Sequence, residues 1–377
     1  MTYSKQDQPF MQRALELAQK ALYITSPNPR VGCVLVDKEG HILGEGHTQK
    51  VGSAHAEIMA LQDAKQKGLD PLGCTAYVTL EPCAHTGRTP PCTHSLINAG
   101  IKRVVASLTD PNPLVSGQGF ESLRAAGIQV DLGLGAEEAY TINEGFIKRM
   151  TQGSPLVRLK IASSLDGATA LHNGNSQWIT GSAARQHGHT WRARSCALLS
   201  GVGTVLRDDP LLNVRFISTP RQPKLILIDA ALDTPQTAAL FKEKREVIIY
   251  CAKAPQDKEK ILTELGATIV VMADAQKPRH VDLRGMLQDL GKREINELHI
   301  EAGAGLNSSF IQQGLVDEFL IYLAPLILAD AKGWTTLPPL ESLDQGKRLT
   351  FLETTPLEQD IFIRARPALP TVQINRA

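Results

Sequence analysis

The sequence predicts an α/β protein built from two domains, each with a central sheet. Its 377 residues exceed what one hydrophobic core usually organises. Helical and strand periodicities alternate along the first half, and strand patterns recur through the second. Between the halves, the sequence Thr-Gln-Gly-Ser-Pro at positions 151–155 forms a short polar break of the kind that separates domains. We therefore expect one domain over residues 1–151 and a second over residues 155–377.

In the first half, helical patterns alternate with short strand patterns. The strand that ends at Leu80 leads directly into Glu81, Pro82 and Cys83, and a helix is expected to begin near Cys92. This order predicts a three-layer α/β domain. The expected segments are helix Asp7–Ile24, strands Val31–Asp37 and His41–Gly46, helix His55–Lys67, strands Cys74–Leu80 and Arg103–Leu108, the continuing alternation at Phe120–Ala126 and Ile128–Leu134, and closing helix Ala136–Met150.

The second half contains many strand patterns separated by turn residues. It predicts a large and mostly parallel sheet. The expected strands are Leu156–Ala162, Cys196–Ser200, Lys224–Ile228, Glu246–Cys251, Ala267–Met272, Glu297–Ile300, Phe319–Leu328, Leu349–Glu353 and Asp360–Arg364.

One imidazole, two thiols and one carboxylate in the first half carry most of the functional information. His55, Cys83 and Cys92 offer three ligands for Zn²⁺, which leaves a fourth tetrahedral position open for water. Bound zinc lowers the pKa of that water to about 7, so that hydroxide exists at neutral pH. Glu57 lies two residues beyond His55 and is expected to carry protons rather than to bind the metal. The set predicts a zinc-dependent amine hydrolase.

A structural zinc site is the alternative, with His85 or His94 as a fourth ligand that closes the metal to substrate. Eight residues separate Cys83 from Cys92, more than the two of the usual deaminase pattern. The six cysteines of so long a chain do not suggest a disulfide framework. The remaining four lie in apolar runs and are expected to be small buried hydrophobic residues: Cys33, Cys74, Cys196 and Cys251.

Composition and charge favour a small-molecule enzyme. The 40 basic and 39 acidic side chains give a formal net charge of +1, and no dense Lys/Arg block is present. We therefore expect no nucleic-acid partner. The first ten residues lack the apolar core of a signal peptide, and no stretch is long and apolar enough to span a bilayer. A cytoplasmic protein without membrane contacts is expected, with assembly into a homo-oligomer.

Four segments in the first half resemble the pyrimidine deaminases of riboflavin biosynthesis, and the long cysteine loop is one of them. They are Asn28–Gly32, Gly44–His47 with Gly52, His55–Glu57, and Cys83–Cys92 with its sequence Cys-Ala-His-Thr-Gly-Arg-Thr-Pro-Pro-Cys. The resemblance implies a cytidine-deaminase-like domain. It also implies that Asn28 and His47 lie in the substrate pocket, and it suggests Arg88 as a further substrate contact. Asn28 as a turn cap and His47 as an ordinary strand-end side chain are the alternatives.

The second half carries two glycine turns after expected strands, Ser200–Thr204 and Glu301–Gly305. Such turns can cradle a nucleotide phosphate, although alone they are more often plain strand connections. Longer segments resemble the reductase domain that follows the deaminase in bifunctional riboflavin enzymes, a fold similar to dihydrofolate reductase. These are Lys160–Gly167, Ser176–Thr180, Arg192–Arg194, Gly203–Pro210, Leu212–Arg215 and Glu301–Gly303.

That resemblance implies one group of residues that hold NADPH: Ala162, Trp178, Thr204, Asp208, Gly303, Ala304, Gly305, Leu306, Asn307, Ser308 and Ser309. A second group is implied to hold the substrate: Ser176, Arg192, Leu212, Arg215 and Glu301. Both arginines can pair bidentately with a ribose phosphate, and the glutamate can accept hydrogen bonds from sugar hydroxyls. As alternatives, the arginines are solvated surface charges and the tryptophan is a core residue. The choice of NADPH over NADH rests on the resemblance.

The resemblance implies two reactions on one substrate. The first is hydrolytic loss of ammonia from 2,5-diamino-6-(5-phosphoribosylamino)pyrimidin-4-one, and the second is NADPH-dependent reduction of the ribosyl chain to 5-amino-6-(5-phosphoribitylamino)uracil. Two other functions stay open from the residues alone. One is a nucleoside or tRNA deaminase with an unrelated tail. The other is a non-catalytic, zinc-stabilised nucleotide-sensing protein, for which a carboxylate beside the metal would have no use.

Overall fold

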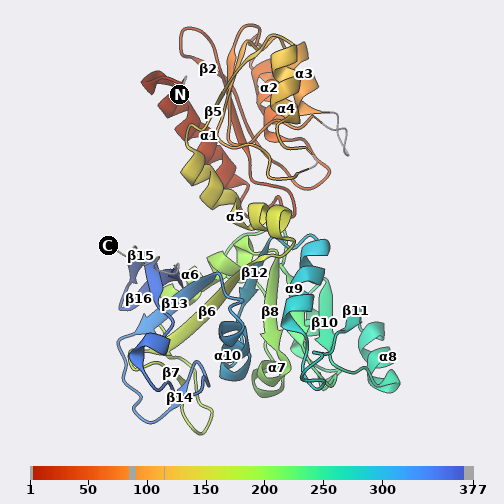
Figure 1. The fold of residues 1–377 in the computed structure, drawn as a ribbon, viewed down its shortest axis with the longest axis vertical. Coiled ribbons are helices and arrows are strands. Elements are labelled where there is room, and N and C mark those ends of the chain that lie inside the picture. The colour runs from red at the N-terminus through yellow and green to blue at the C-terminus, as the bar shows by residue number, and fades with distance from the viewer. Residues whose placement is uncertain (1–2, 85–90, 114, 369–377) are drawn as a thin grey trace, which may run out of the picture. The chain divides into compact units, whose positions relative to one another are not determined.

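The structure, a computed structural model, describes residues 3–84, 91–113 and 115–368. The chain divides into two compact units (Figure 1). The first unit comprises Met1–Pro155 together with the short segment Gly291–Asn296, and the second comprises Leu156–Leu290 and Glu297–Ala377. The first unit therefore includes a piece of chain that lies far along the sequence from the rest of it.

A five-stranded sheet in the order β2-β1-β3-β4-β5 forms the centre of the first unit. β1 pairs antiparallel with β2 and β3, whereas β3, β4 and β5 are parallel. The parallel strands run toward one edge, and the chain leaves β3 toward Cys83 there. The strands are β1 (Gly32–Val36), β2 (Ile42–His47), β3 (Thr75–Val78), β4 (Arg103–Ala106) and β5 (Gln129–Leu132).

Helices cover both faces of this sheet, because its inner strand β1 is apolar on both sides. Cys33 and Leu35 of β1 face a core shared with α2, α3 and α4, whereas Val34 and Val36 face a core shared with α1 and α5. The predicted three-layer arrangement is confirmed. The helices are α1 (Gln8–Lys20), α2 (Ala56–Gln66), α3 (Cys92–Asn98), α4 (Gln118–Ala125) and α5 (Ala136–Gln152).

Two glycines let helices approach the sheet very closely. A Cβ atom added at Gly32 of β1 would lie 1.9 Å from the carbonyl oxygen of Ala14 in α1. On the other face, a Cβ added at Gly46 of β2 would lie 2.3 Å from the carbonyl oxygen of Ala56 in α2. Any side chain at these positions would push the helix away. The second contact fixes the first turn of α2, which carries the predicted catalytic carboxylate.

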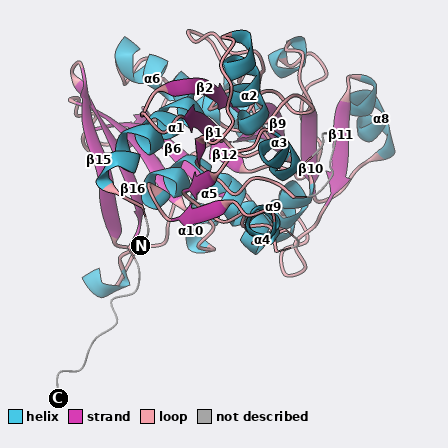
Figure 2. Cartoon of the chain, turned by 90° about the horizontal axis from the view of Figure 1, so that it is seen from above, coloured by secondary structure: helices cyan, strands magenta, loops and turns pink. Residues whose placement is uncertain are grey.

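The second unit is built on a nine-stranded sheet in the order β11-β10-β9-β8-β12-β6-β13-β16-β15. Its strands are parallel from β11 to β13, and β16 and β15 complete it in antiparallel pairing. β10 and β11 lie at one end and β15 and β16 at the other (Figure 2). The bounds are β6 (Leu156–Ser164), β8 (Ala197–Gly201), β9 (Lys224–Ile228), β10 (Val247–Cys251), β11 (Ala267–Val271), β12 (Glu297–Ile300), β13 (Glu318–Ala324), β15 (Leu349–Leu357) and β16 (Asp360–Pro367).

Helices connect the parallel strands of this sheet, as a parallel arrangement requires. They are α6 (Ser182–Arg194), α7 (Val202–Asp208), α8 (Gln256–Glu264), α9 (Leu283–Lys292) and α10 (Ala304–Gln312). A separate two-stranded sheet pairs β7 (Ala168–Ala170) with β14 (Lys332–Gly333). This small sheet was not predicted, because such short strands leave no periodicity in the sequence.

The large, mostly parallel sheet is confirmed, and the main difference lies in the strand expected over Phe319–Leu328. β13 ends at Ala324, because the chain turns so that the backbone N–H of Leu326 donates to the carbonyl of Ala324 at 2.8 Å. The apolar residues that follow are partly exposed rather than part of the sheet. In the described part of the chain, no helix is long and apolar enough to cross a membrane.

One buried carboxylate joins the N-terminal segment to the first sheet. Asp7 is 3 % exposed, and its oxygens accept hydrogen bonds from Arg103 Nη1 and Nη2 at 2.7 and 3.0 Å and from the Tyr77 hydroxyl at 2.6 Å. The hydrogen bond from Arg103 is the largest of the effects that hold the pKa of Asp7 well below its usual range.

We predict that Asp7→Asn lowers the free energy of unfolding at pH 7 by about 3 kcal/mol, because Arg103 loses a buried partner. The folded-state pKa of Asp7 is depressed, so its contribution is present above the unfolded pKa of about 3.9 and is lost as pH falls below it. Urea unfolding at pH 7 and at pH 3 measures both effects. The exposed Asp70→Asn is the control, and an equal loss at both pH values would contradict the assignment.

Candidate active sites

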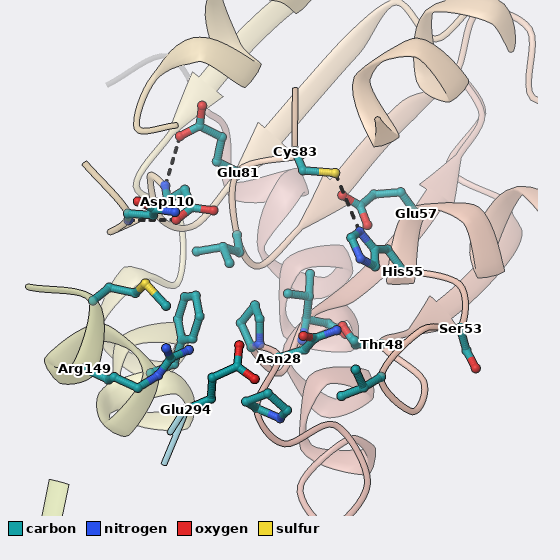
Figure 3. A pocket seen from close by; sticks show the side chains of 18 of the residues that line it. Asn28, Thr48, Ser53, His55, Glu57, Glu81, Cys83, Asp110, Arg149 and Glu294 are labelled. Atoms are coloured by element: carbon teal, nitrogen blue, oxygen red, sulfur yellow. Dashed lines mark hydrogen bonds between the residues drawn. The ribbon is translucent and has the colours of Figure 1, made fainter. Parts of the chain in front are cut away.

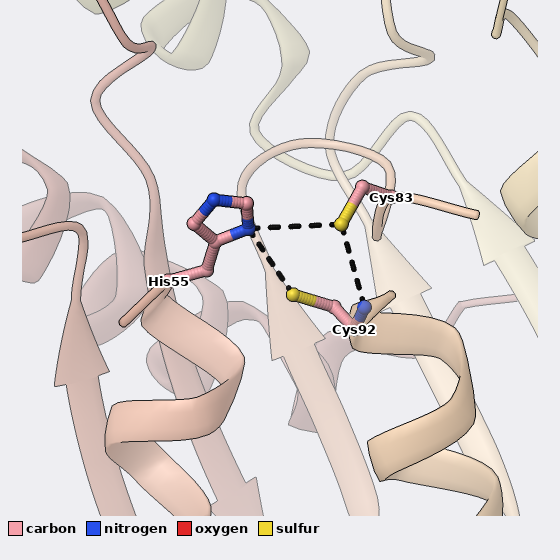
Figure 4. A group of neighbouring side chains, drawn as sticks. All are labelled: His55, Cys83 and Cys92. Atoms are coloured by element: carbon pink, nitrogen blue, oxygen red, sulfur yellow. Dashed lines mark hydrogen bonds between the residues drawn. The ribbon is translucent and has the colours of Figure 1, made fainter. Parts of the chain in front are cut away.

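The three side chains predicted to bind metal lie together in the first unit. His55 Nδ1 lies 3.3 Å from Cys92 Sγ and 3.6 Å from Cys83 Sγ (Figure 4). The three candidate ligand atoms all lie within 4.8 Å of one another. One nitrogen and two sulfur donors at this spacing suit tetrahedral Zn²⁺ with one position left over.

Helix N-termini position two of these ligands. His55 is the N-cap residue of α2, and Cys92 is the first residue of α3. The backbone N–H of Cys92 donates to Cys83 Sγ at 3.3 Å, which favours a thiolate at that position. The prediction that a helix begins near Cys92 is confirmed.

The electrostatics of the cluster favour a thiolate at Cys83. The side-chain hydrogen bond from Cys92 lowers the pKa of the Cys83 thiol to about 4, and a hydrogen bond with His55 acts in the same direction. Glu57 lies in the first turn of α2 and is 4 % exposed. Burial, followed by the charge of Cys83, raises the pKa of the Glu57 carboxyl to about 7. A carboxyl in this environment can both accept and release a proton near neutral pH.

No fourth protein ligand completes the cluster among the described residues. His94 is exposed and is not part of the group, while His85 lies outside the described residues. The four other cysteines are buried and lie apart from the cluster, as expected. Within the described residues, the three donors leave one tetrahedral position without a protein ligand.

A pocket of about 350 Å³ opens beside the cluster and is lined by residues of the first unit alone (Figure 3). Asn28, His55, Glu57 and Cys83 line it. His47 ends β2 and is not among the lining residues. Arg88, the remaining predicted substrate contact, lies outside the described residues.

Several lining residues had no predicted role. Glu81 is buried and accepts hydrogen bonds from the backbone N–H groups of Asp110, Gly117 and Gly119 at 2.9, 3.0 and 2.8 Å. It thereby holds the loop that leads into α4, and Asp110 and Asn112 of this loop line the pocket. The only sequence feature that could have indicated this loop is the polar and proline-rich stretch that begins at Asp110. Phe146, Arg149, Met150 and Glu294 complete a further part of the wall.

In the second unit, the two glycine turns lie next to each other at the carboxyl-terminal ends of two inner strands of the large sheet. β8 and β12 are parallel neighbours, and each ends in a turn that begins a helix, with Gly201 as the N-cap of α7 and Gly303 as the N-cap of α10. A cavity of about 380 Å³ lies there. A Cβ added at Gly203, Gly303 or Gly305 would meet nothing within 4 Å, so the backbone is open to a ligand.

The predicted cofactor residues divide into three groups. Thr204 and the residues from Gly303 to Leu306 line this cavity, and Ser309 lines a neighbouring one. Asn307 and Ser308 are buried and bind a nearby loop instead, through Asn307 Nδ2 to the carbonyl of Trp334 at 3.0 Å and through the Ser308 hydroxyl, which accepts the N–H of Thr336 at 2.7 Å. Three further predicted contacts lie outside the cavity lining: Ala162, Trp178 and Asp208.

An ion-pair cluster surrounds Glu301. Arg192 donates to both of its carboxylate oxygens, through Nε at 2.5 Å and Nη2 at 2.8 Å. Lys160 Nζ lies 3.7 Å from Glu301 Oε2, and the fully buried His299 places Nε2 3.2 Å from Oε1. Although burial would raise it, the charges of Arg192 and Lys160 hold the pKa of Glu301 well below its usual range. The bidentate partner of Arg192 in this structure is thus a carboxylate, so an incoming phosphate would meet a guanidinium that is already paired.

The other predicted substrate contacts differ in exposure. Leu212 is buried in the left-handed backbone region at φ 50°, and Arg245 Nη1 donates to its carbonyl at 2.5 Å. Ser176 and Arg215 are exposed. Trp178 is 66 % exposed, which excludes the alternative that it is a core residue, and the guanidinium of Arg185 lies 4.4 Å from the centre of its ring.

Two family models match the chain. Residues 4–108 match the cytidine and deoxycytidylate deaminase zinc-binding region, and residues 155–363 match the RibD C-terminal domain. The first match contains the histidine and cysteine cluster, and the second contains both glycine turns.

Full-length relatives agree with both matches. The chain is 43 % identical over 369 residues to the riboflavin biosynthesis protein RibD of Escherichia coli, covering 94 % of this chain and 98 % of that one. It is 44 % identical over 380 residues to RibD of Haemophilus influenzae, covering 97 % and 99 %. The solved RibD structure from Acinetobacter baumannii superposes with a TM-score of 0.88 at 43 % identity, covering 97 % and 99 %.

A further solved structure is of a protein named for both activities. The diaminohydroxyphosphoribosylaminopyrimidine deaminase/5-amino-6-(5-phosphoribosylamino)uracil reductase of Thermotoga maritima superposes with a TM-score of 0.85. The two chains are 33 % identical over 96 % of this chain and 99 % of that one. The predicted α/β folds of both domains are therefore confirmed.

We predict that Cys92→Ala abolishes tight zinc binding, because a ligand set of one imidazole and one thiolate cannot fill three positions. Metal analysis after dialysis should find about one zinc ion per chain in the unaltered protein and close to none in the variant. Cys74→Ala removes a buried cysteine outside the cluster and should keep its zinc. Zinc retained at the unaltered level in Cys92→Ala would contradict this ligand assignment.

Proposed function

The chain belongs to the RibD family of riboflavin biosynthesis proteins, and we propose that its two domains act in turn on one phosphorylated ribosylaminopyrimidine. It is a bifunctional enzyme, with a zinc-dependent deaminase in the first domain and an NADPH-dependent reductase in the second. A nucleoside or tRNA deaminase with an unrelated tail is not favoured, because relatives match along both domains. A non-catalytic sensor is disfavoured for the same reason.

The proposed first step is loss of ammonia from 2,5-diamino-6-(5-phosphoribosylamino)pyrimidin-4-one. The observation that supports it most strongly is the buried Glu57 carboxylate beside the His55, Cys83 and Cys92 cluster in an open pocket. His55, Cys83 and Cys92 would hold the zinc ion, which would lower the pKa of a water molecule to about 7. Glu57 takes the proton of the attacking water and delivers it to the departing amine, while Asn28 orients the ring.

The proposed second step is reduction of the ribosyl chain, for which NADPH supplies the hydride. The backbone of Gly203, Gly303 and Gly305 would hold the cofactor in the cavity beside α7 and α10, which Thr204 also lines. Glu301 accepts hydrogen bonds from the sugar hydroxyls. For the other residues predicted to hold NADPH or the substrate of the reductase, the proposed roles rest on the family resemblance alone.

We expect a cytoplasmic homo-oligomer that binds neither nucleic acid nor membrane. The near-balance of 40 basic and 39 acidic side chains supports the absence of a nucleic-acid partner.

The proton-carrier role of Glu57 is tested by Glu57→Gln. The amide keeps the shape of the side chain and cannot accept the proton, so ammonia release should fall by about 10³-fold while zinc content stays unchanged. Glu121→Gln, an exposed position in α4, is the matched control. Ammonia release within a few-fold of the unaltered enzyme would refute this role, and loss of zinc would assign Glu57 to the metal instead.

We further predict that Glu301→Gln lowers kcat/KM for the reduction by about 10²-fold, because the amide leaves Arg192 and Lys160 without a counter-charge and binds sugar hydroxyls less strongly. Deamination by the same variant should stay within twofold. Reduction is followed by NADPH absorbance with the deaminated intermediate as substrate, and the exposed Glu246→Gln serves as control. Unchanged reduction would remove Glu301 from the site.

A further inference from the structure

The segment Gly291–Asn296, which comprises the last two residues of α9 and the residues that lead from it to β12, belongs to the first unit. Its first residue packs directly on the end of the deaminase domain. A Cβ added at Gly291 would lie 2.0 Å from the carbonyl oxygen of Gly153, so only glycine fits there. Glu294 in the middle of the segment has a left-handed backbone at φ 63° and lines the pocket beside the zinc cluster.

The last residue of this segment, Asn296, is 5 % exposed and uses both ends of its side-chain amide. Its Oδ1 accepts a hydrogen bond from Arg149 Nε at 2.5 Å, and its Nδ2 donates to the carbonyl of Pro27 at 2.8 Å. An amide oxygen only accepts and an amide nitrogen only donates, so these two partners together fix the orientation of the side chain.

One of those partners belongs to the loop that carries the predicted substrate contact Asn28. Pro27, Asn28 and Pro29 all line the pocket. A second side-chain amide holds the far end of this loop, because Asn143 Oδ1 accepts from the N–H of Arg30 at 2.7 Å and Asn143 Nδ2 donates to its carbonyl at 2.8 Å. Asn28 therefore lies between two anchors, one from α5 and one from Asn296.

The other hydrogen-bond partner of Asn296 is Arg149, a cationic residue in the pocket wall. Within the described part of the chain, Arg149 is the only permanently cationic residue that lines this pocket. In Figure 3, Arg149 and Glu294 lie in one part of the pocket, and His55, Glu57 and Cys83 lie in another. The Asn296 bond to Nε restrains the guanidinium, whose charge suits an anionic substrate that reaches from the metal site.

We propose that Asn296 is a positioning residue of the deaminase, which holds the Asn28 loop and Arg149 in the geometry that binds the phosphorylated substrate. A residue encoded beyond the first domain thus sets substrate affinity at the zinc site. This inference rests on the proposed deaminase function. It concerns binding rather than the proton transfers at Glu57, so its effect falls on KM.

The test uses Asn296→Ala and Asn296→Asp in the full chain, with ammonia release measured over a range of substrate concentrations. Asn296→Ala removes both hydrogen bonds, and we expect KM to rise by about tenfold or more with kcat within about twofold. Asn296→Asp still accepts from Arg149 but cannot donate to Pro27, so KM should rise by a smaller factor. Zinc content and reduction of the deaminated intermediate should stay unchanged in both variants.

Hydrogen exchange gives a second readout, since peptides that cover residues 22–31 should exchange faster in both variants than in the unaltered protein. Asn98→Ala, at an exposed asparagine of α3, is the control for KM and for exchange. An unchanged KM in either variant, or kcat and both activities falling together, would overturn the proposal. If Asn296→Ala does not fold, Asn296→Asp decides by the same criteria. Absence of ammonia release by the unaltered enzyme would instead refute the proposed function.

Discussion

The close packing of α2 against β2 is the contact on which the deaminase site depends. The carbonyl of Ala56 approaches Gly46 so closely that no Cβ would fit, and this holds the first turn of α2 at the sheet. His55 caps that turn and Glu57 lies within it, so one backbone contact positions both the candidate metal ligand and the proposed proton carrier. Cys92 begins α3 on the same face and places its sulfur beside the imidazole.

The second domain differs from the first, because the hydride for its reaction comes from a cofactor and its residues only bind and orient the reactants. Parallel neighbours β8 and β12 end at the same edge, where two helix N-termini and bare glycine backbone offer N–H donors to phosphate. Glu301 follows β12 directly and keeps its charge while partly buried, because Arg192 and Lys160 compensate it. The glycine turn at Gly303 and the ion-paired Glu301 therefore both follow the end of β12.

Local patterns in the sequence predicted the metal ligands, because His55, Glu57, Cys83 and Cys92 lie in short motifs attached to predictable strands and helices. Contacts set by tertiary structure left no such pattern. The pairing of Arg192 with Glu301 joins residues that were each assigned to the substrate. Asn296 reaches the deaminase pocket from far along the chain, so a boundary drawn at one polar break cannot include it.

The central claim is that one chain carries out both reactions in a fixed order. Mass spectrometry of the diaminopyrimidine ribosyl phosphate after incubation with zinc-loaded protein, once without NADPH and once with it, tests this most directly. We predict that the deaminated aminouracil accumulates without NADPH and is converted to the ribityl product when NADPH is added. Survival of the substrate under both conditions would contradict the account, and deamination without reduction would contradict its second half.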